Sequence, residues 1–158
     1  MPTLFEDRDA IRDLFARYCL YIDSSRGEEY ASLFTEDGTF DIRMGDPIVG
    51  REALAAMVNS MLVHYTHHMI TNLVIEVDGD EATCDASAMV FSKGVLRMTT
   101  HTHDDLVRVG DQWQIRFRTY EPDPVDDADV AGSEAEVAAS AERMADFQRL
   151  GGWQSTDA

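Results

Sequence analysis

Basic side chains are scarce in this sequence. Thirteen lysines and arginines stand against thirty aspartates and glutamates in 158 residues, which gives a formal charge of −17. Such a charge would repel a phosphate backbone and an anionic membrane surface, so we expect no binding to nucleic acid or to a membrane. Long apolar runs and a basic, apolar leader are also lacking. We therefore expect a soluble, cytoplasmic protein.

Cysteine is rare as well. Cys19 and Cys84 lie in separate amphipathic segments and show no CxxC spacing. This arrangement argues against a redox pair and against a zinc site, and it predicts two buried free thiols.

The hydrophobic residues, 44% of the chain, follow first a helical and then a strand period. Three helical segments and one strand precede four strand-like runs, and the short turns "DGD", "SKG" and "VGDQ" separate those runs as in successive antiparallel hairpins. This order predicts an α+β fold, in which a curved, cone-shaped sheet is wrapped by three helices and opens at one end into a small-molecule pocket. The helices are expected at about 7–25, 28–34 and 50–62, and the strands at about 38–44, 66–77, 81–92, 96–109 and 112–120.

The composition changes after Tyr120. Residues 121–158 hold ten acidic and two basic side chains. We expect one domain over 1–122, followed over 123–158 by an acidic linker and a C-terminal helix that opens with a capping box of Ser133 and Glu136. A lone helix of this length is marginal in water, so it should dock on the domain or on a partner subunit.

Three of the five histidines crowd into the segment "HYTHH", directly before a strand. A metal site, a proton-transfer site and ordinary packing are all compatible with His64, His67 and His68. A metal site is the poorest of these geometrically, because His64 ends a helix and the other two rings alternate between opposite strand faces. Simple alternation would place His67 with Met69 towards the core and His68 outward.

One acidic residue favours proton transfer. Asp23 closes the first predicted helix, five residues after Tyr18. A helix end that crosses the pocket can point this carboxylate inward, where it would bond one imidazole nitrogen and leave the other free for a substrate. The alternative is an ordinary aspartate that faces water at a helix end.

Several segments together carry a family resemblance. These are "IRDLFARYCLYID", "YASLFTEDGTFD", "GREALAAM", "HHMITNLVIEVDGDEATCDAS" and "HDDLVRVGDQWQIRFRTY", over roughly residues 7–120. In this order they resemble the SnoaL-like branch of the nuclear transport factor 2-like superfamily, which includes polyketide cyclases, scytalone dehydratase, bile acid 7α-dehydratase and hexachlorocyclohexane dehydrochlorinase. The resemblance implies a cystatin-like α+β barrel. It does not fix a reaction, because this fold hosts enzymes, binding modules and assembly subunits.

The resemblance implies a catalytic set. The dehydratases and the dehydrochlorinase of this family use an Asp at the end of the first helix and a His at the start of the strand after the third helix. In this sequence Asp23 and His68 hold these positions. The dehydratases add an upstream Tyr, matched by Tyr18. The second His of scytalone dehydratase has no counterpart in "AMVFSKG", although His101 and His103 lie one strand later.

Arginines on the last strand fall where some relatives place an anion-binding residue. Alternation nevertheless groups Arg116 and Arg118 with Gln114 and Tyr120, which favours a solvated or subunit-facing stripe.

The hypothesis from the sequence is a cofactor-free lyase or isomerase without a metal, of the dehydratase type. His68 would act as general base, Asp23 would orient it, and Tyr18 would donate a hydrogen bond to a substrate carbonyl. The partner would be a small hydrophobic, aromatic or polycyclic substrate. Candidate substrate-binding residues are Tyr21, Phe40, Met57, Asn72, Met89, Phe91, His103 and Arg118.

Other functions stay open on the same fold. The pocket could serve a non-catalytic ligand-binding module or an accessory subunit, or the enzyme could be an aldol-type cyclase or a retro-aldol lyase. An epoxide hydrolase would need Arg97 or Arg118 to converge with Asn72 near Asp23. The exposed outer side of such a sheet also favours a homodimer or homotrimer.

Overall fold

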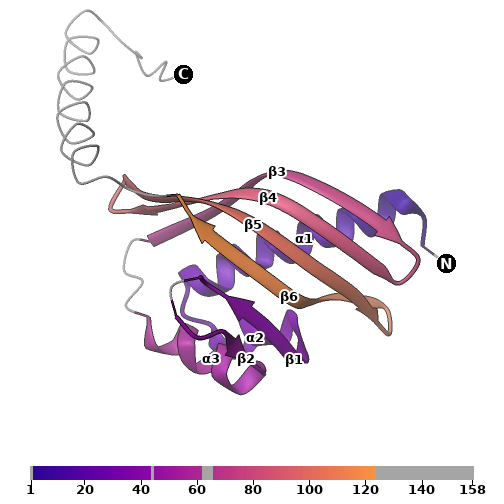
Figure 1. Cartoon of the computed structure of the whole chain (residues 1–158), viewed down its shortest axis with the longest axis horizontal. Coiled ribbons are helices and arrows are strands. Elements are labelled where there is room, and N and C mark those ends of the chain that lie inside the picture. The colour runs from indigo at the N-terminus through magenta and orange to yellow at the C-terminus, as the bar shows by residue number, and fades with distance from the viewer. Residues whose placement is uncertain (1, 44, 62–65, 124–158) are drawn as a thin grey trace, which may run out of the picture. The chain divides into compact units, whose positions relative to one another are not determined.

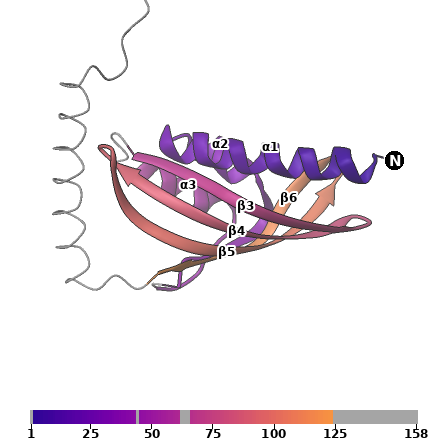
Figure 2. The same cartoon turned by 90° about the horizontal axis from the view of Figure 1, so that it is seen from above.

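The computed structural model describes residues 2–43, 45–61 and 66–123. There, three helices lie against one face of a single curved, six-stranded sheet (Figures 1 and 2). The expected α+β class and the cystatin-like arrangement are confirmed, although the sheet stays open and does not close into a barrel. The helices are α1 (Leu4–Asp23), α2 (Gly27–Ser32) and α3 (Arg51–Ser60), and the strands are β1 (Phe34–Asp41), β2 (Ile48–Val49), β3 (Thr66–Asp78), β4 (Glu81–Ser92), β5 (Val95–Val109) and β6 (Gln112–Pro122).

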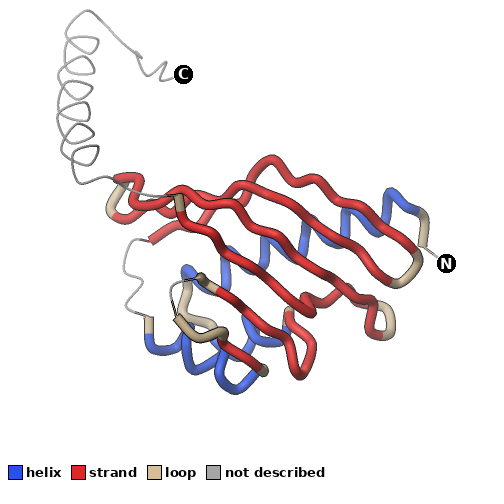
Figure 3. Tube along the Cα trace, viewed as in Figure 1, coloured by secondary structure: helices blue, strands red, loops and turns tan. Residues whose placement is uncertain are grey.

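The strand order is β2-β1-β6-β5-β4-β3, so β2 and β3 are the two edges. β3 to β6 form the three expected antiparallel hairpins (Figure 3). β1 runs parallel to β6. The two-residue strand β2 was not expected from the sequence. The predicted linker and C-terminal helix lie outside the described residues.

Helix α1 starts at Leu4, three residues before the expected start. Thr3 caps it, because the Thr3 hydroxyl accepts from the Glu6 backbone N–H while the Glu6 carboxylate accepts from Thr3. Its buried stripe, which packs on the sheet, consists of Ile11, Leu14, Phe15, Tyr18 and Ile22 with Asp7 at the start. No helix in the described ranges is both long and apolar enough to cross a bilayer.

A bulge resets side-chain alternation in β3. Thr71 lies opposite Ser87 and Val74 opposite Asp85, so β3 holds one extra residue, and Asn72 there has a φ of +56°. Up to the bulge the even positions face the helices, and beyond it the odd positions do. His68 therefore shares the helix-covered face, called the inner face below, with the buried Ile75. Simple alternation along the whole strand would instead place His67 inward, and the bulge is the reason that it does not hold.

A second bulge acts in the same way on β6. Asp105 lies opposite Phe117 and Leu106 opposite Ile115, so Arg116 is the extra residue. Arg118 consequently turns to the inner face, where it is 1% exposed. The solvated stripe expected for Arg118 is corrected, whereas Arg116 is exposed and pairs with Glu81 at 2.8 Å.

Candidate active site

The end of α1 meets the start of β3 through a carboxylate and an imidazole. Oδ1 of Asp23 lies 2.6 Å from Nδ1 of His68, and the two side chains are only 14% and 18% exposed. The same carboxylate accepts the His68 backbone N–H, at 2.9 Å to Oδ2. The meeting of Asp23 and His68 that the hypothesis requires is therefore present in the structure.

The position of β3 at the sheet edge explains the backbone contact. Every second N–H of an edge strand points away from the sheet and has no partner strand. At His68 this N–H is satisfied by Asp23, so one carboxylate fixes both the backbone and the ring of this residue. His67 stays 69% exposed, and its Nδ1 lies 4.0 Å from Asp23, too far for a hydrogen bond. His64 lies outside the described residues.

The imidazole keeps one nitrogen free. Because an ionised carboxylate can accept but cannot donate, Nδ1 of His68 carries the proton in its contact with the Asp23 carboxylate, and Nε2 is then the basic nitrogen of the neutral ring. Within the described ranges Nε2 makes no hydrogen bond. The arrangement can accept a proton at Nε2 and stabilise the resulting imidazolium through Asp23.

Apolar side chains flank His68 on the inner face. Residues directly opposite in antiparallel strands share a face, and His68 stands in one cross-strand row with Val90 and Met98. Met98 contacts Tyr120, whose hydroxyl lies 3.5 Å from the Met98 sulfur. The sequence did not indicate Val90, Met98 and Tyr120 as site residues. They come near His68 through the pairing register of neighbouring strands, which the pattern of a single strand does not reveal.

Tyr18 belongs to a second, deeper cluster. Its hydroxyl accepts from Tyr30 at 3.0 Å, and the Arg118 guanidinium lies 4.4 Å from the centre of its ring. Five residues separate Tyr18 from Asp23, which turns the two side chains about 140° apart around the helix. Burial raises the pKa of Tyr18, so its hydroxyl keeps a proton to donate. The structure thus brings Tyr18 to Arg118 and not to His68.

Arg118 forms a buried ion pair. Its Nη1 lies 2.8 Å from Oδ1 of Asp104, and the side chains are 1% and 0% exposed. Burial raises the pKa of Asp104 to about 6, although the Arg118 charge opposes this shift. Sequence reasoning missed Asp104 because an aspartate in the run "HTHDDL" gives no sign of burial.

Four predicted substrate-binding residues do not join the inner face near His68. Met89 and Phe91 lie opposite Met69 and His67, on the outer face, which none of the described helices covers. His103 is also on that face, where its Nδ1 lies 2.7 Å from Asp85. Asn72 is exposed at the bulge. Their assignment to a pocket beside His68 is corrected, and the Arg118 and Asn72 network of an epoxide hydrolase does not form beside Asp23.

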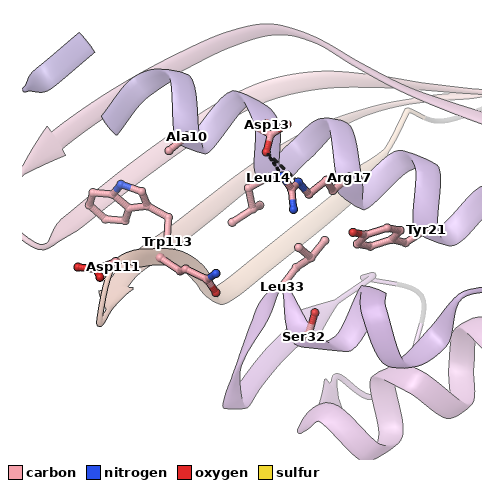
Figure 4. Close-up of a pocket in the computed structure, with 10 residues that line it drawn as sticks. Ala10, Asp13, Leu14, Arg17, Tyr21, Ser32, Leu33, Asp111 and Trp113 are labelled. Carbon is pink, nitrogen blue, oxygen red and sulfur yellow. Dashed lines mark hydrogen bonds and ion pairs between the residues drawn. The ribbon is translucent and has the colours of Figure 1, made fainter. Parts of the chain in front are cut away.

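The other predicted residues lie on the helix side. Phe40 is 5% exposed and packs edge-on against Tyr120, with ring centres 6.2 Å apart. Met57 is half-buried against the core. Tyr21 stacks with Arg26 and borders a surface hollow between α1 and the α2–β1 and β5–β6 connections (Figure 4). That hollow lies on a different side of α1 from Asp23.

Both thiols are free, as expected. Cys84 is buried and Cys19 is half-buried on α1. Burial raises the pKa of Cys19 to about 11 and that of Cys84 to about 12, so both stay protonated and neither is a ready nucleophile.

A family model described as a SnoaL-like domain matches residues 4–119. The chain belongs to the SnoaL-like family. This membership, together with the fold, supports a small-molecule-binding or catalytic role for the protein. Comparison with the curated proteins gives no match.

Solved structures of similar proteins cover most of the chain. An NTF2-like protein with a cystatin-like fold from Novosphingobium aromaticivorans is 27% identical, with a TM-score of 0.72 over 81% of this chain and 89% of its own. An Asp-to-Asn variant of Rv3472, a protein of unknown function from Mycobacterium tuberculosis, is 32% identical, with a TM-score of 0.72 over 88% and 96%. A Catenulispora acidiphila protein, solved in complex with S-DNPA, is 27% identical, with a TM-score of 0.65 over 73% and 92%.

Proposed function

We propose that this SnoaL-like protein is a cofactor-independent lyase or isomerase that abstracts a proton from carbon in a small hydrophobic substrate. The observation that carries the proposal is the 2.6 Å contact between Asp23 and Nδ1 of His68, which leaves Nε2 as the base. Asp23 offsets the charge of the imidazolium that forms. Elimination then expels a leaving group, whereas isomerisation returns the proton to another carbon.

The surroundings of His68 suit an apolar substrate. Val90 and Met98 stand in its row, and Ile70 lies two residues along the same face. A largely apolar site strengthens the interaction between the imidazolium and Asp23, because little water screens it. Tyr18, which keeps its own proton, is the candidate donor to a substrate oxygen on the Arg118 side of the site.

The S-DNPA complex of the Catenulispora acidiphila relative supports ligand binding by this fold. We propose that an aromatic or polycyclic molecule binds here in the same general way. Dehydration and double-bond isomerisation both need a single base near an acidified C–H of the substrate. The Asp23–His68 pair supplies this base.

The outer face supports a homodimer or homotrimer as the working assembly. No described helix covers this face, and Met69 and Val74 are 47% and 59% exposed there. Half-buried Met89 and Phe91 continue the apolar surface. A second copy that covers these side chains would remove them from water.

The test uses 5-nitrobenzisoxazole, whose ring opens with release of a coloured phenolate when a base removes its carbon-bound proton. Wild-type protein should accelerate this reaction, and His68→Ala should lower the rate at least about 100-fold, the lower range for loss of a positioned base. Asp23→Asn should also lower it, because the amide stabilises the imidazolium less well than a carboxylate.

His67→Ala is the matched control, because His67 lies beside the same carboxylate without a hydrogen bond to it. It should keep the wild-type rate. Equal rates for the His68→Ala and wild-type proteins would refute the assignment of His68 as the base.

A further inference from the structure

Three buried polar atoms on the inner face have no hydrogen-bond partner within the described part of the chain. They are Oγ1 of Thr102, Oδ2 of Asp104 and Nε of Arg118. The three side chains are 4%, 0% and 1% exposed. A buried polar atom without a partner costs free energy, so three on neighbouring residues call for a group that completes them.

These atoms are neighbours across the sheet. Asp104 lies directly opposite Arg118, and Thr102 is the next inner-face residue of β5. Only one edge of the ion pair is used, through Nη1 of Arg118 and Oδ1 of Asp104. The pair therefore leaves the buried Nε of Arg118 as an unused donor and the buried Oδ2 of Asp104 as an unused acceptor, with the Thr102 hydroxyl beside them.

Small side chains lie between this cluster and His68. The next two cross-strand rows after that of His68 pair Ala88 with Thr100 and Ala86 with Thr102. All four are less than 9% exposed. The strand residues between His68 and Arg118 in these rows therefore carry only short side chains.

Resting on the proposed proton transfer, we propose that the substrate carries a neutral hydroxyl group remote from its reacting carbon, bound by Thr102, Asp104 and Arg118. A hydroxyl both accepts and donates, so it accepts from Nε of Arg118 and donates to Oδ2 of Asp104. A substrate carbonyl has no proton to donate and would leave Oδ2 of Asp104 without a hydrogen-bond partner. A substrate carboxylate would be repelled by the negative charge of Asp104.

The spacing sets the size of the molecule. Thr102 is four residues along β5 from Met98, which shares the row of His68. This is about 13 Å of backbone, and side-chain tips on a concave face come closer. A flat skeleton of two or three fused rings spans this distance, with the hydroxyl at one end and the acidic C–H at the other.

Calorimetric titration of the full chain at pH 7.5 with 2-naphthol and 2-naphthoate tests the proposal. Wild-type protein should bind 2-naphthol at least about tenfold more tightly than 2-naphthoate. Asp104→Asn should reverse this preference, because it removes the charge that repels the carboxylate. Equal affinities in the wild type, or no binding of 2-naphthol, would overturn the proposal.

Thr102→Val keeps the shape of the side chain and deletes only the unpartnered hydroxyl. It should fold at least as stably as the wild type and bind 2-naphthol several-fold more weakly. Thr83→Val, on the outer face, is the matched control and should leave the affinity unchanged. An unchanged 2-naphthol affinity in Thr102→Val would show that the Thr102 hydroxyl does not bind the ligand, and this would contradict the proposed site.

The two proposals fail separately. Loss of benzisoxazole turnover in His68→Ala, combined with no effect of Thr102→Val on binding, removes only the hydroxyl site. Discrimination between naphthol and naphthoate, combined with unchanged turnover in His68→Ala, removes only the base.

Discussion

At the scale of single residues, the candidate site depends on Asp23. This carboxylate binds the backbone N–H and the ring nitrogen of His68 together. The sequence indicated this meeting, because a carboxylate at a helix end and a histidine at a strand start can face each other across a sheet. The partners of Tyr18 could not be predicted, since Tyr30 and Arg118 reach it only through tertiary packing.

The buried Asp104 should make stability depend on pH. Burial raises its pKa to about 6 in the folded protein, above the ordinary value of an aspartate side chain, so the folded state holds this proton more tightly than the unfolded state does. The stability from this group is complete below pH 4 and is lost as the pH rises towards 6, by at most about 3 kcal/mol.

Urea unfolding of the wild type and of Asp104→Asn between pH 4 and pH 7 measures this term. The difference in unfolding free energy, wild type minus variant, should fall as the pH rises. A difference that grows with pH would show that Arg118 lowers the pKa of Asp104 more than burial raises it.

At the scale of elements, the helices and the four long strands were predictable from hydrophobic period and turn signals. The faces were not. One inserted residue in β3 and one in β6 reverse the side-chain alternation, and neither Asn72 nor Arg116 marks its bulge plainly in the sequence. Those two bulges decide that His68 and Arg118 face inward.

The bulge at Asn72 should tolerate few side chains. Its φ of +56° suits asparagine and glycine, whereas a β-branched residue is strained there. Asn72→Val should lower the unfolding free energy by about 1–2 kcal/mol, and Asn72→Gly should change it by less than half of that. Urea unfolding gives both values.

Glu76→Val serves as the control for that series, because Glu76 is exposed in regular β3 backbone. It should change stability by less than about 0.5 kcal/mol. Equal losses for Asn72→Val and Glu76→Val would contradict a strained bulge.

At the scale of the whole molecule, the sheet has two unlike faces. The described helices cover the inner face (Figure 2). The outer face carries the exposed side chains of Met69, Val74 and Leu96, and also the pair of His103 and Asp85. The fold class followed from the order of the elements. The assignment of Met89 and Phe91 to the pocket failed, because an apolar residue on a sheet fits a pocket wall and a subunit interface equally well in sequence.

Self-association through the outer face can be tested by light scattering. Wild-type protein should have the mass of a dimer or trimer, and Phe91→Glu should be a monomer, since a charge at an apolar interface is costly to bury. Glu76→Gln, an exposed position on β3, should keep the wild-type mass. A monomeric wild-type protein would contradict self-association through the outer face.

The most direct test of the proposed base is the tautomer of His68, read by 15N NMR of histidine-labelled protein at pH 8. Asp23 should hold the proton on Nδ1 and leave Nε2 unprotonated, and Asp23→Leu should shift the ring towards the Nε2–H form that free histidine prefers. A wild-type ring protonated on Nε2 would contradict the account, because the nitrogen assigned to the substrate could then accept no proton.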